Sequence, residues 1–76
     1  MPKLPQVSGK DLVRALSKSG FAIRRQRGSH IIMVHATDLS RRCVIPVHAN
    51  RPIKPGTLHS ILDGAQITVD DLLELL

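Results

Sequence analysis

Apolar residues near the start of the chain recur with the spacing of a helix. The residues that share one helical face are Leu12, Val13 and Leu16. Ser8 precedes them as a helix N-cap, and Asp11 follows it at the spacing of a capping box. Gly20 supplies the left-handed residue that commonly follows a helix. The pattern therefore predicts a helix over residues 9–19.

The spacing of apolar residues then changes to that of a β-hairpin. Apolar and polar residues alternate over residues 21–27, which predicts a strand. One side of it would carry Phe21, Ile23 and Arg25, and the other Ala22, Arg24 and Gln26. Gly28-Ser29 is a hairpin turn signal, and β-branched residues predict a second strand over residues 30–36. This strand is largely apolar on both sides, which is typical of a central strand. One of these sides would carry His30, Ile32 and Val34.

A polar turn and a third strand follow the hairpin. Residues 37–42 form the turn, and Arg41-Arg42 within it would serve solubility rather than make contacts. A third strand is predicted over residues 43–47. Pro46 near its end favours an edge position, because proline cannot donate a ladder hydrogen bond. Since short turns join the three strands, the sheet should be antiparallel.

The last third of the chain returns to helical spacing. After a loop over residues 49–54, Pro55 stands at a helix start, and a helix is predicted over about residues 56–65. The apolar residues of that helix are Leu58, Ile61, Leu62 and Ala65. Thr68 and Asp71 have the spacing of a second capping box, which would begin a short apolar terminal helix.

The predicted order is therefore a helix, three strands and a helix, with an added short helix. An extended lead-in over residues 1–7, which carries Pro2 and Pro5, precedes them. Helices that are apolar on one side can cover one face of an antiparallel sheet. We expect an α+β fold in one domain over residues 1–76, with a three-stranded sheet and the helices on one face.

Charge is distributed unevenly along the chain. The formal net charge is +5, and residues 1–54 hold all eleven Lys and Arg but only two of the six acidic residues. Such an excess of positive charge over the first 54 residues predicts a polyanionic partner, although a surface that only serves solubility would carry the same charge. Phe21 is the only aromatic residue, which argues against RNA binding through aromatic stacking and leaves phosphate electrostatics as the main route.

Several classes of protein do not fit the composition. Cys43 is the only cysteine, so the disulfide framework of a small secreted protein is excluded. The polar opening residues do not resemble a signal peptide, and no apolar run approaches the roughly 20 residues that cross a bilayer. The four histidines do not match a zinc spacing. We therefore expect a cytoplasmic protein with no contact to a membrane and no metal or other cofactor.

His30 is the strongest candidate for chemistry. It follows the predicted turn Gly28-Ser29, and Arg24, Arg25 and Arg27 lie on the strand before it. Imidazole can accept and donate a proton near neutral pH, and RNA carries its own nucleophile in the 2′-hydroxyl. Guanidinium groups stabilise a charged phosphorane well. The alternative is that His30 only begins a strand, half buried and hydrogen-bonded.

Two further segments could support this chemistry. His48 could be a second proton carrier, or it could cap the third strand through a loop carbonyl. Lys54 precedes a helix N-terminus, whose free N–H groups bind anions, although it could equally point into solvent.

The chain resembles the HicA toxins over nearly its whole length. Each matching block is weak alone, but their order and spacing are fairly specific. The blocks are Ser8-Gly9-Lys10, Gly20-Phe21, Arg27-Gly28-Ser29-His30, Ile45-Pro46-Val47-His48, Pro55-Gly56-Thr57-Leu58 and Thr68-Val69-Asp70-Asp71-Leu72. Two departures are visible: His59 stands where the family often has a basic residue, and residues 63–65 replace a longer, more basic stretch.

The resemblance implies a double-stranded-RNA-binding-domain-like fold and endoribonuclease activity on mRNA as the toxin of a type II toxin–antitoxin system. It implies that His30 is catalytic and that a HicB-type antitoxin blocks the site. Cleavage would halt translation and slow growth. Within this hypothesis Arg25, Arg27 and Lys54 hold phosphate, and Ser29 helps set the turn that presents His30. The alternatives are a non-catalytic RNA-binding module of the same fold and a basic protein-interaction domain. The sequence leaves self-association open.

Overall fold

The computed structural model describes residues 3–76, so the part of the predicted lead-in that contains Pro2 lies outside the described residues. Residues 3–7 are neither helix nor strand. The elements that follow are α1 (Gly9–Lys18), β1 (Phe21–Arg27), β2 (His30–His35), β3 (Arg42–Pro46), α2 (Pro55–Ala65) and α3 (Val69–Leu75).

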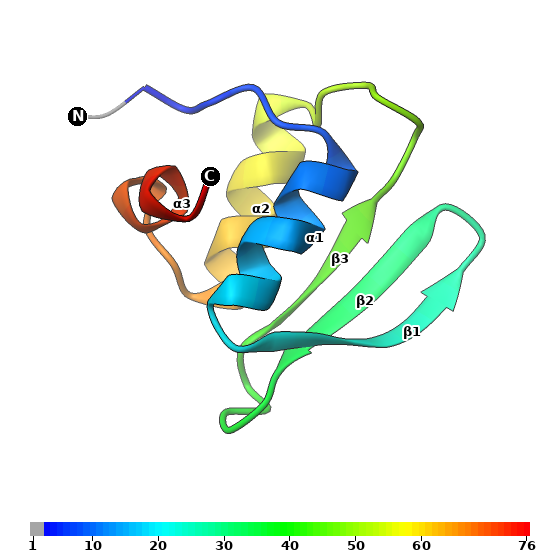
Figure 1. Ribbon diagram of the computed structural model, residues 1–76, viewed down its shortest axis with the longest axis vertical. Helices are drawn as coiled ribbons and strands as arrows, with labels where there is room; N and C mark the ends of the chain where they lie inside the picture. Colours follow the sequence, from blue (N-terminus) through cyan, green and yellow to red (C-terminus); the bar gives the residue numbers. More distant parts are fainter. Residues whose placement is uncertain (1–2) are drawn as a thin grey trace.

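The three strands form one antiparallel sheet in the order β1-β2-β3, so β2 is central and β3 is an edge strand, as predicted. α1 and α2 cover one face of the sheet, and α3 packs beside α1 away from the strands (Figure 1). None of the helices formed by residues 3–76 lies on the other face (Figure 1). This arrangement confirms the predicted α+β, double-stranded-RNA-binding-domain-like fold.

A single cluster of aliphatic side chains fills the space between the helices and the sheet. Its largest fully buried members are Leu12, Leu16, Met33, Ile45, Leu58 and Leu72. Burying each such side chain contributes about 1.5–3 kcal/mol relative to leaving it in water. Within residues 3–76, no helix has the length and apolar character that a bilayer crossing requires.

Local hydrogen bonds begin and end the helices much as the sequence predicted. The hydroxyl of Ser8 accepts from the backbone N–H of Asp11 at 3.1 Å, and α1 ends before Gly20, whose φ is +93°. The carboxylate of Asp11 faces Arg14 at 3.8 Å. The capping box of α3 is complete, because Thr68 and Asp71 exchange two hydrogen bonds of 3.1 Å.

The alternation predicted for the first strand is wrong beyond Ile23, because β1 contains a β-bulge there. The pairs before the bulge include Phe21–His35 and Ile23–Met33, and those after it include Arg25–Ile32 and Arg27–His30. A bulge inserts one extra residue, so every later side chain changes face. Arg25 therefore leaves the side of Phe21 and Ile23 and joins the helix-free face with His30.

The prediction for Arg41 is also wrong. Its side chain is half-buried, its Nε donates to the carbonyl of Ala65 at 2.9 Å, and its guanidinium lies 5.4 Å from the ring centre of Phe21. The arginine thus satisfies a carbonyl at the end of α2, where the helix dipole favours a cation. Arg42 belongs to β3 rather than to the turn.

Candidate functional site

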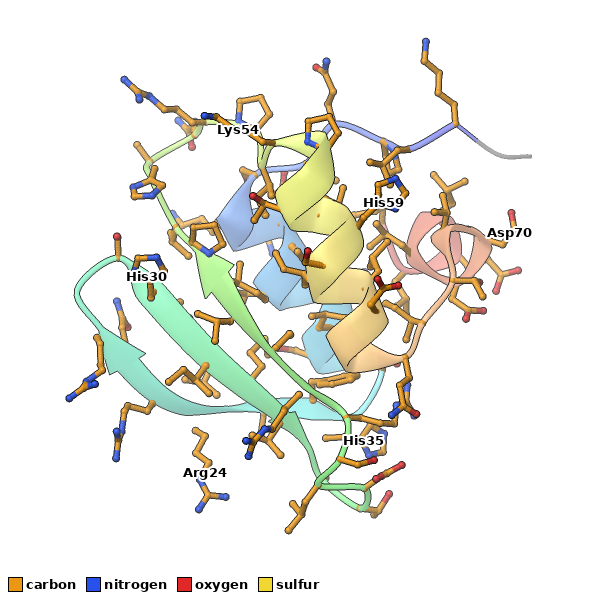
Figure 2. The ribbon with its side chains drawn as sticks, turned by 180° about the vertical axis from the view of Figure 1, so that it is seen from behind. Arg24, His30, His35, Lys54, His59 and Asp70 are labelled. Atoms are coloured by element: carbon orange, nitrogen blue, oxygen red, sulfur yellow. The ribbon has the colours of Figure 1, made fainter. Side chains whose placement is uncertain are left out.

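His30 begins β2 at the hairpin end of the sheet (Figure 2). Its backbone pairs with Arg27 on one side and Pro46 on the other, and its side chain is exposed. Residues that face each other in an antiparallel pair project to the same side, so Arg27 and His30 share the helix-free face. The ring is therefore open to water with a guanidinium-bearing residue directly across from it.

The hairpin is tied to the end of β3, and this brings a second histidine close. The N–H of Val47 donates to the carbonyl of Ser29 at 2.6 Å, which continues the ladder past the last pair of the sheet. His48 follows at once, and its ring centre lies 6.4 Å from that of His30, with the two planes at 84°. Ser29 thus contributes to the site through its backbone carbonyl.

The loop after His48 is held in place by the lead-in of the chain. The N–H of Arg51 donates to the carbonyl of His48 at 3.0 Å, which closes a tight turn that includes Ala49 at φ +52°. The N–H of the buried Ile53 donates to the carbonyl of Val7 at 2.8 Å. A loop anchored at both ends can hold its side chains in a fixed position relative to the hairpin.

These segments line a cavity of about 440 Å³ that is open to solvent, and this volume is typical of ligand pockets. Its lining residues are His30, Pro46, His48, Arg51, Pro52, Ile53, Lys54 and Thr57. The lining contains two imidazoles and two cationic side chains but no carboxylate. An anionic ligand is therefore favoured there by charge.

The N-terminus of α2 adds a further positive element to this cavity. Lys54 is the N-cap of the helix, and its side chain makes no capping hydrogen bond. The first helical hydrogen bond runs from the N–H of Leu58 to the carbonyl of Lys54, so the N–H groups of residues 56 and 57 have no partner within the helix. Together with the helix dipole, these groups favour phosphate.

The structure brings together only some of the residues predicted from the sequence. His30, His48 and Lys54 line one cavity, and Arg27 flanks it across the hairpin. Arg25 instead lines a separate groove on the helix-free face.

Sequence analysis did not identify Arg51 and Thr57, which also line this cavity. Thr57 lies in the first turn of the helix predicted over residues 56–65. Arg51 lies in the predicted loop before that helix and carries the positive charge that an anion site needs. No spacing rule connects either of them to His30.

The remaining histidines and the cysteine lie elsewhere. His35 is at the opposite end of the sheet (Figure 2), where its Nδ1 accepts from the N–H of Thr37 at 3.2 Å and its ring meets Phe21 edge-on at 5.1 Å. His59 is exposed on α2. Burial raises the pKa of the Cys43 thiol to about 11, so Cys43 is not a nucleophile at neutral pH.

Comparison with known proteins identifies the family of the chain. The model of a family described as the HicA toxin of bacterial toxin–antitoxin systems matches residues 9–67, which include the hairpin, the second histidine and the whole of α1 and α2. No curated protein sequence matches the chain. Since the matched segment covers most of the chain, the protein belongs to the HicA family and is a toxin of a toxin–antitoxin system.

Proposed function

We propose that this toxin is a metal-independent endoribonuclease that cleaves mRNA in the cavity around His30. The observation that carries the proposal is the exposed pair of imidazoles, 6.4 Å apart, in a cavity lined by cations and free of carboxylates. Two groups that can exchange protons near neutral pH, placed on either side of a phosphate site, suffice for transesterification of RNA.

The reaction needs only the ribose hydroxyl as a nucleophile. One imidazole takes the proton of a 2′-hydroxyl, and the 2′-oxygen attacks the adjacent phosphorus. The bond from phosphorus to the 5′-oxygen of the next nucleotide breaks, and the second imidazole, already protonated, donates its proton to that oxygen. The products are a 2′,3′-cyclic phosphate and a 5′-hydroxyl, and proton exchange with water restores both rings.

Positive groups around the cavity stabilise the charge that develops on phosphorus. Lys54, Arg51 and the first N–H groups of α2 all face an anion placed in the cavity. Arg27, across the hairpin from His30, is placed to hold a neighbouring phosphate. Ser29 has a positioning role, because its carbonyl ties the hairpin to β3.

The biological setting follows from the same site. The partner in the cell is a HicB-type antitoxin, and the exposed, cationic cavity suits an acidic segment of such a protein. Since the substrate is mRNA, the toxin acts in the cytoplasm. Unchecked cleavage stops translation and arrests growth until the antitoxin returns.

The decisive test compares three single variants, His30→Ala, His48→Ala and His59→Ala, on a single-stranded RNA. We expect the first two to lose about 10²–10⁴-fold in cleavage rate, the usual contribution of a general acid or base. His59→Ala serves as the control, because His59 is exposed on α2 and lies outside the cavity. Product analysis should find a 2′,3′-cyclic phosphate, and a 2′-deoxy substitution at the cleaved bond should abolish the reaction.

A second substrate assigns the two proton transfers. An aryl ester of a 3′-nucleotide has a leaving group that needs no proton, so it rescues the variant that lacks the general acid and not the one that lacks the base. Cleavage by His30→Ala at the wild-type rate would refute the proposal that catalysis takes place at His30. If all three variants and the wild type bind RNA without cutting it, the protein is an RNA-binding module. If RNA binding does not weaken steeply with salt, it is a protein-interaction domain.

A further inference from the structure

A second groove, of about 580 Å³, lies on the helix-free face of the sheet, apart from the cavity around His30. We call it the arginine groove, and it is defined by its lining residues, which are Arg24, Arg25, Ile32, Val34, Arg42, Cys43 and Val44. They come from all three strands. All of them except the buried Cys43 lie outside the cluster that packs against the helices.

The floor of the arginine groove is apolar although no layer covers it. Val34 is only 7% exposed and yet lies outside the helix-side core, whereas Val44 is 49% exposed. Ile32 lies between them on the central strand and is half-buried. A sheet face without a covering helix is normally polar, so an aliphatic strip here indicates that something docks on it.

The rim of the arginine groove is strongly cationic. Arg24 points away from the helices (Figure 2), and the bulge in β1 places Arg25 on the same face. Arg42 approaches from the other edge, opposite Val34. The three strands carry no acidic residue. An occupant of this groove must therefore combine negative charge with a surface that tolerates aliphatic contact.

Although it is a separate groove, the arginine groove lies on the same face of β2 as His30. His30, Ile32 and Val34 are alternate residues of β2 and project to one face. Since a strand rises about 3.3 Å per residue, the groove begins about 7 Å from His30 and reaches about 13 Å from it. A polynucleotide with one phosphate at His30 must pass over this face or leave the protein.

We propose that the arginine groove is a nucleotide subsite that holds single-stranded RNA next to the bond cleaved at His30. The guanidinium groups contact phosphates and stack on bases, and the aliphatic floor contacts the flat face or edge of one base. The inference rests on the proposed nuclease function and adds where the flanking nucleotides lie. Sharing a strand face with His30 favours RNA over an acidic protein segment, because a substrate has to extend from that residue.

The first test measures binding rather than cleavage, so its failure is distinct from failure of the nuclease proposal. In the His30→Ala protein, the double change Arg24→Gln/Arg42→Gln is compared with Lys10→Gln/Arg14→Gln on the exposed face of α1, which removes the same charge. Fluorescence anisotropy with a short single-stranded RNA gives the affinity at several salt concentrations.

Loss of two phosphate contacts lowers the slope of log affinity against log salt by about 1.4. When the salt concentration rises from 50 to 200 mM, the factor by which RNA affinity falls should therefore be about seven times smaller for the groove variant than for its parent. The α1 variant should keep the parental slope. Equal slopes for the two double variants would overturn the proposal, because the effect would then come from net charge alone.

A photocrosslinking residue at position 44 supplies the second arm, with one at position 59 as control. Crosslinks from position 44 to nucleotides beside the cleavage site, and none from position 59, are expected. Overturning results are an absence of crosslinks from position 44, or unchanged RNA binding by the groove variant together with weakened binding of the antitoxin. The second of these would assign the groove to the protein partner.

Discussion

Gly64 lies where α2 crosses the start of β3, and alanine at this position tests how tightly the two elements pack. A Cβ added there would stand 2.5 Å from the carbonyl oxygen of Arg42, whereas ordinary contact begins at 3.4 Å. The obstacle is a backbone atom of a paired strand, which cannot rotate away. Helix and strand would have to separate by about 0.9 Å, the difference between those two distances.

Two effects of opposite sign decide the stability of Gly64→Ala. Alanine improves helix propensity by about 1 kcal/mol, whereas overpacking a tight contact costs about 1–3 kcal/mol. We expect a net loss of about 1 kcal/mol in the free energy of unfolding. For a domain of this size that loss lowers the Tm by about 4–8 °C.

Gly56→Ala is the matched control, because it is the same substitution in the same helix. No atom lies within 4 Å of a Cβ built at Gly56, so only the propensity gain applies and its Tm should rise. Circular dichroism at 222 nm can follow both thermal and urea unfolding, since the chain has no Trp or Tyr for fluorescence. If Gly64→Ala is as stabilising as Gly56→Ala, the close approach of α2 to β3 is not a real constraint.

Three further predictions follow from other contacts. A Cβ at Gly9 would overlap the backbone at the end of β3, so Gly9→Ala should displace His48. RNA cleavage should slow by more than the lower stability of the variant explains, and an unchanged cleavage rate would contradict the prediction. Cys43, whose thiol pKa is raised to about 11 by burial, should react with iodoacetamide far more slowly in the folded protein than in urea, and equal rates would refute its burial. Hydrogen bonds from Thr68 lower the pKa of Asp71 in the folded protein. The ionised carboxylate therefore stabilises the fold above its unfolded-state pKa, and this stabilisation is lost as the pH falls through the lower folded-state pKa. The urea midpoints at pH 7 and pH 2.5 should differ less for Asp71→Asn than for the wild type.

Much of the candidate site could be predicted from the sequence because its elements are defined locally. A turn signal at Gly28-Ser29 placed His30 at the start of a strand, and Pro55 placed Lys54 at a helix N-terminus. The two N-caps that act through their side chains, Ser8 and Thr68, bond to residues three positions further along the chain. Such signals depend only on near neighbours in the chain, so they survive in any fold that keeps the elements.

The tertiary structure decided which of these side chains meet. The alternation of β1 predicted Arg25 on the side of Phe21, and only pairing with β2 revealed the bulge that moves it to the face of His30. The approach of His48 to His30 depends on a hydrogen bond between the hairpin and the end of β3. Arg51 lines the cavity because its loop is held by a strand-like contact between Pro52 and Ser8.

Helix caps, turns and apolar spacing are short-range effects, and the sequence alone determined the six elements and the place of His30 at the start of a strand. Strand register, bulges and loop anchoring depend on contacts between residues far apart in the chain. These contacts contribute free energy only once the hydrophobic core has formed, so no local sequence pattern encodes them. The paired imidazoles and the arginine groove therefore belong to the folded protein and not to any single stretch of its sequence.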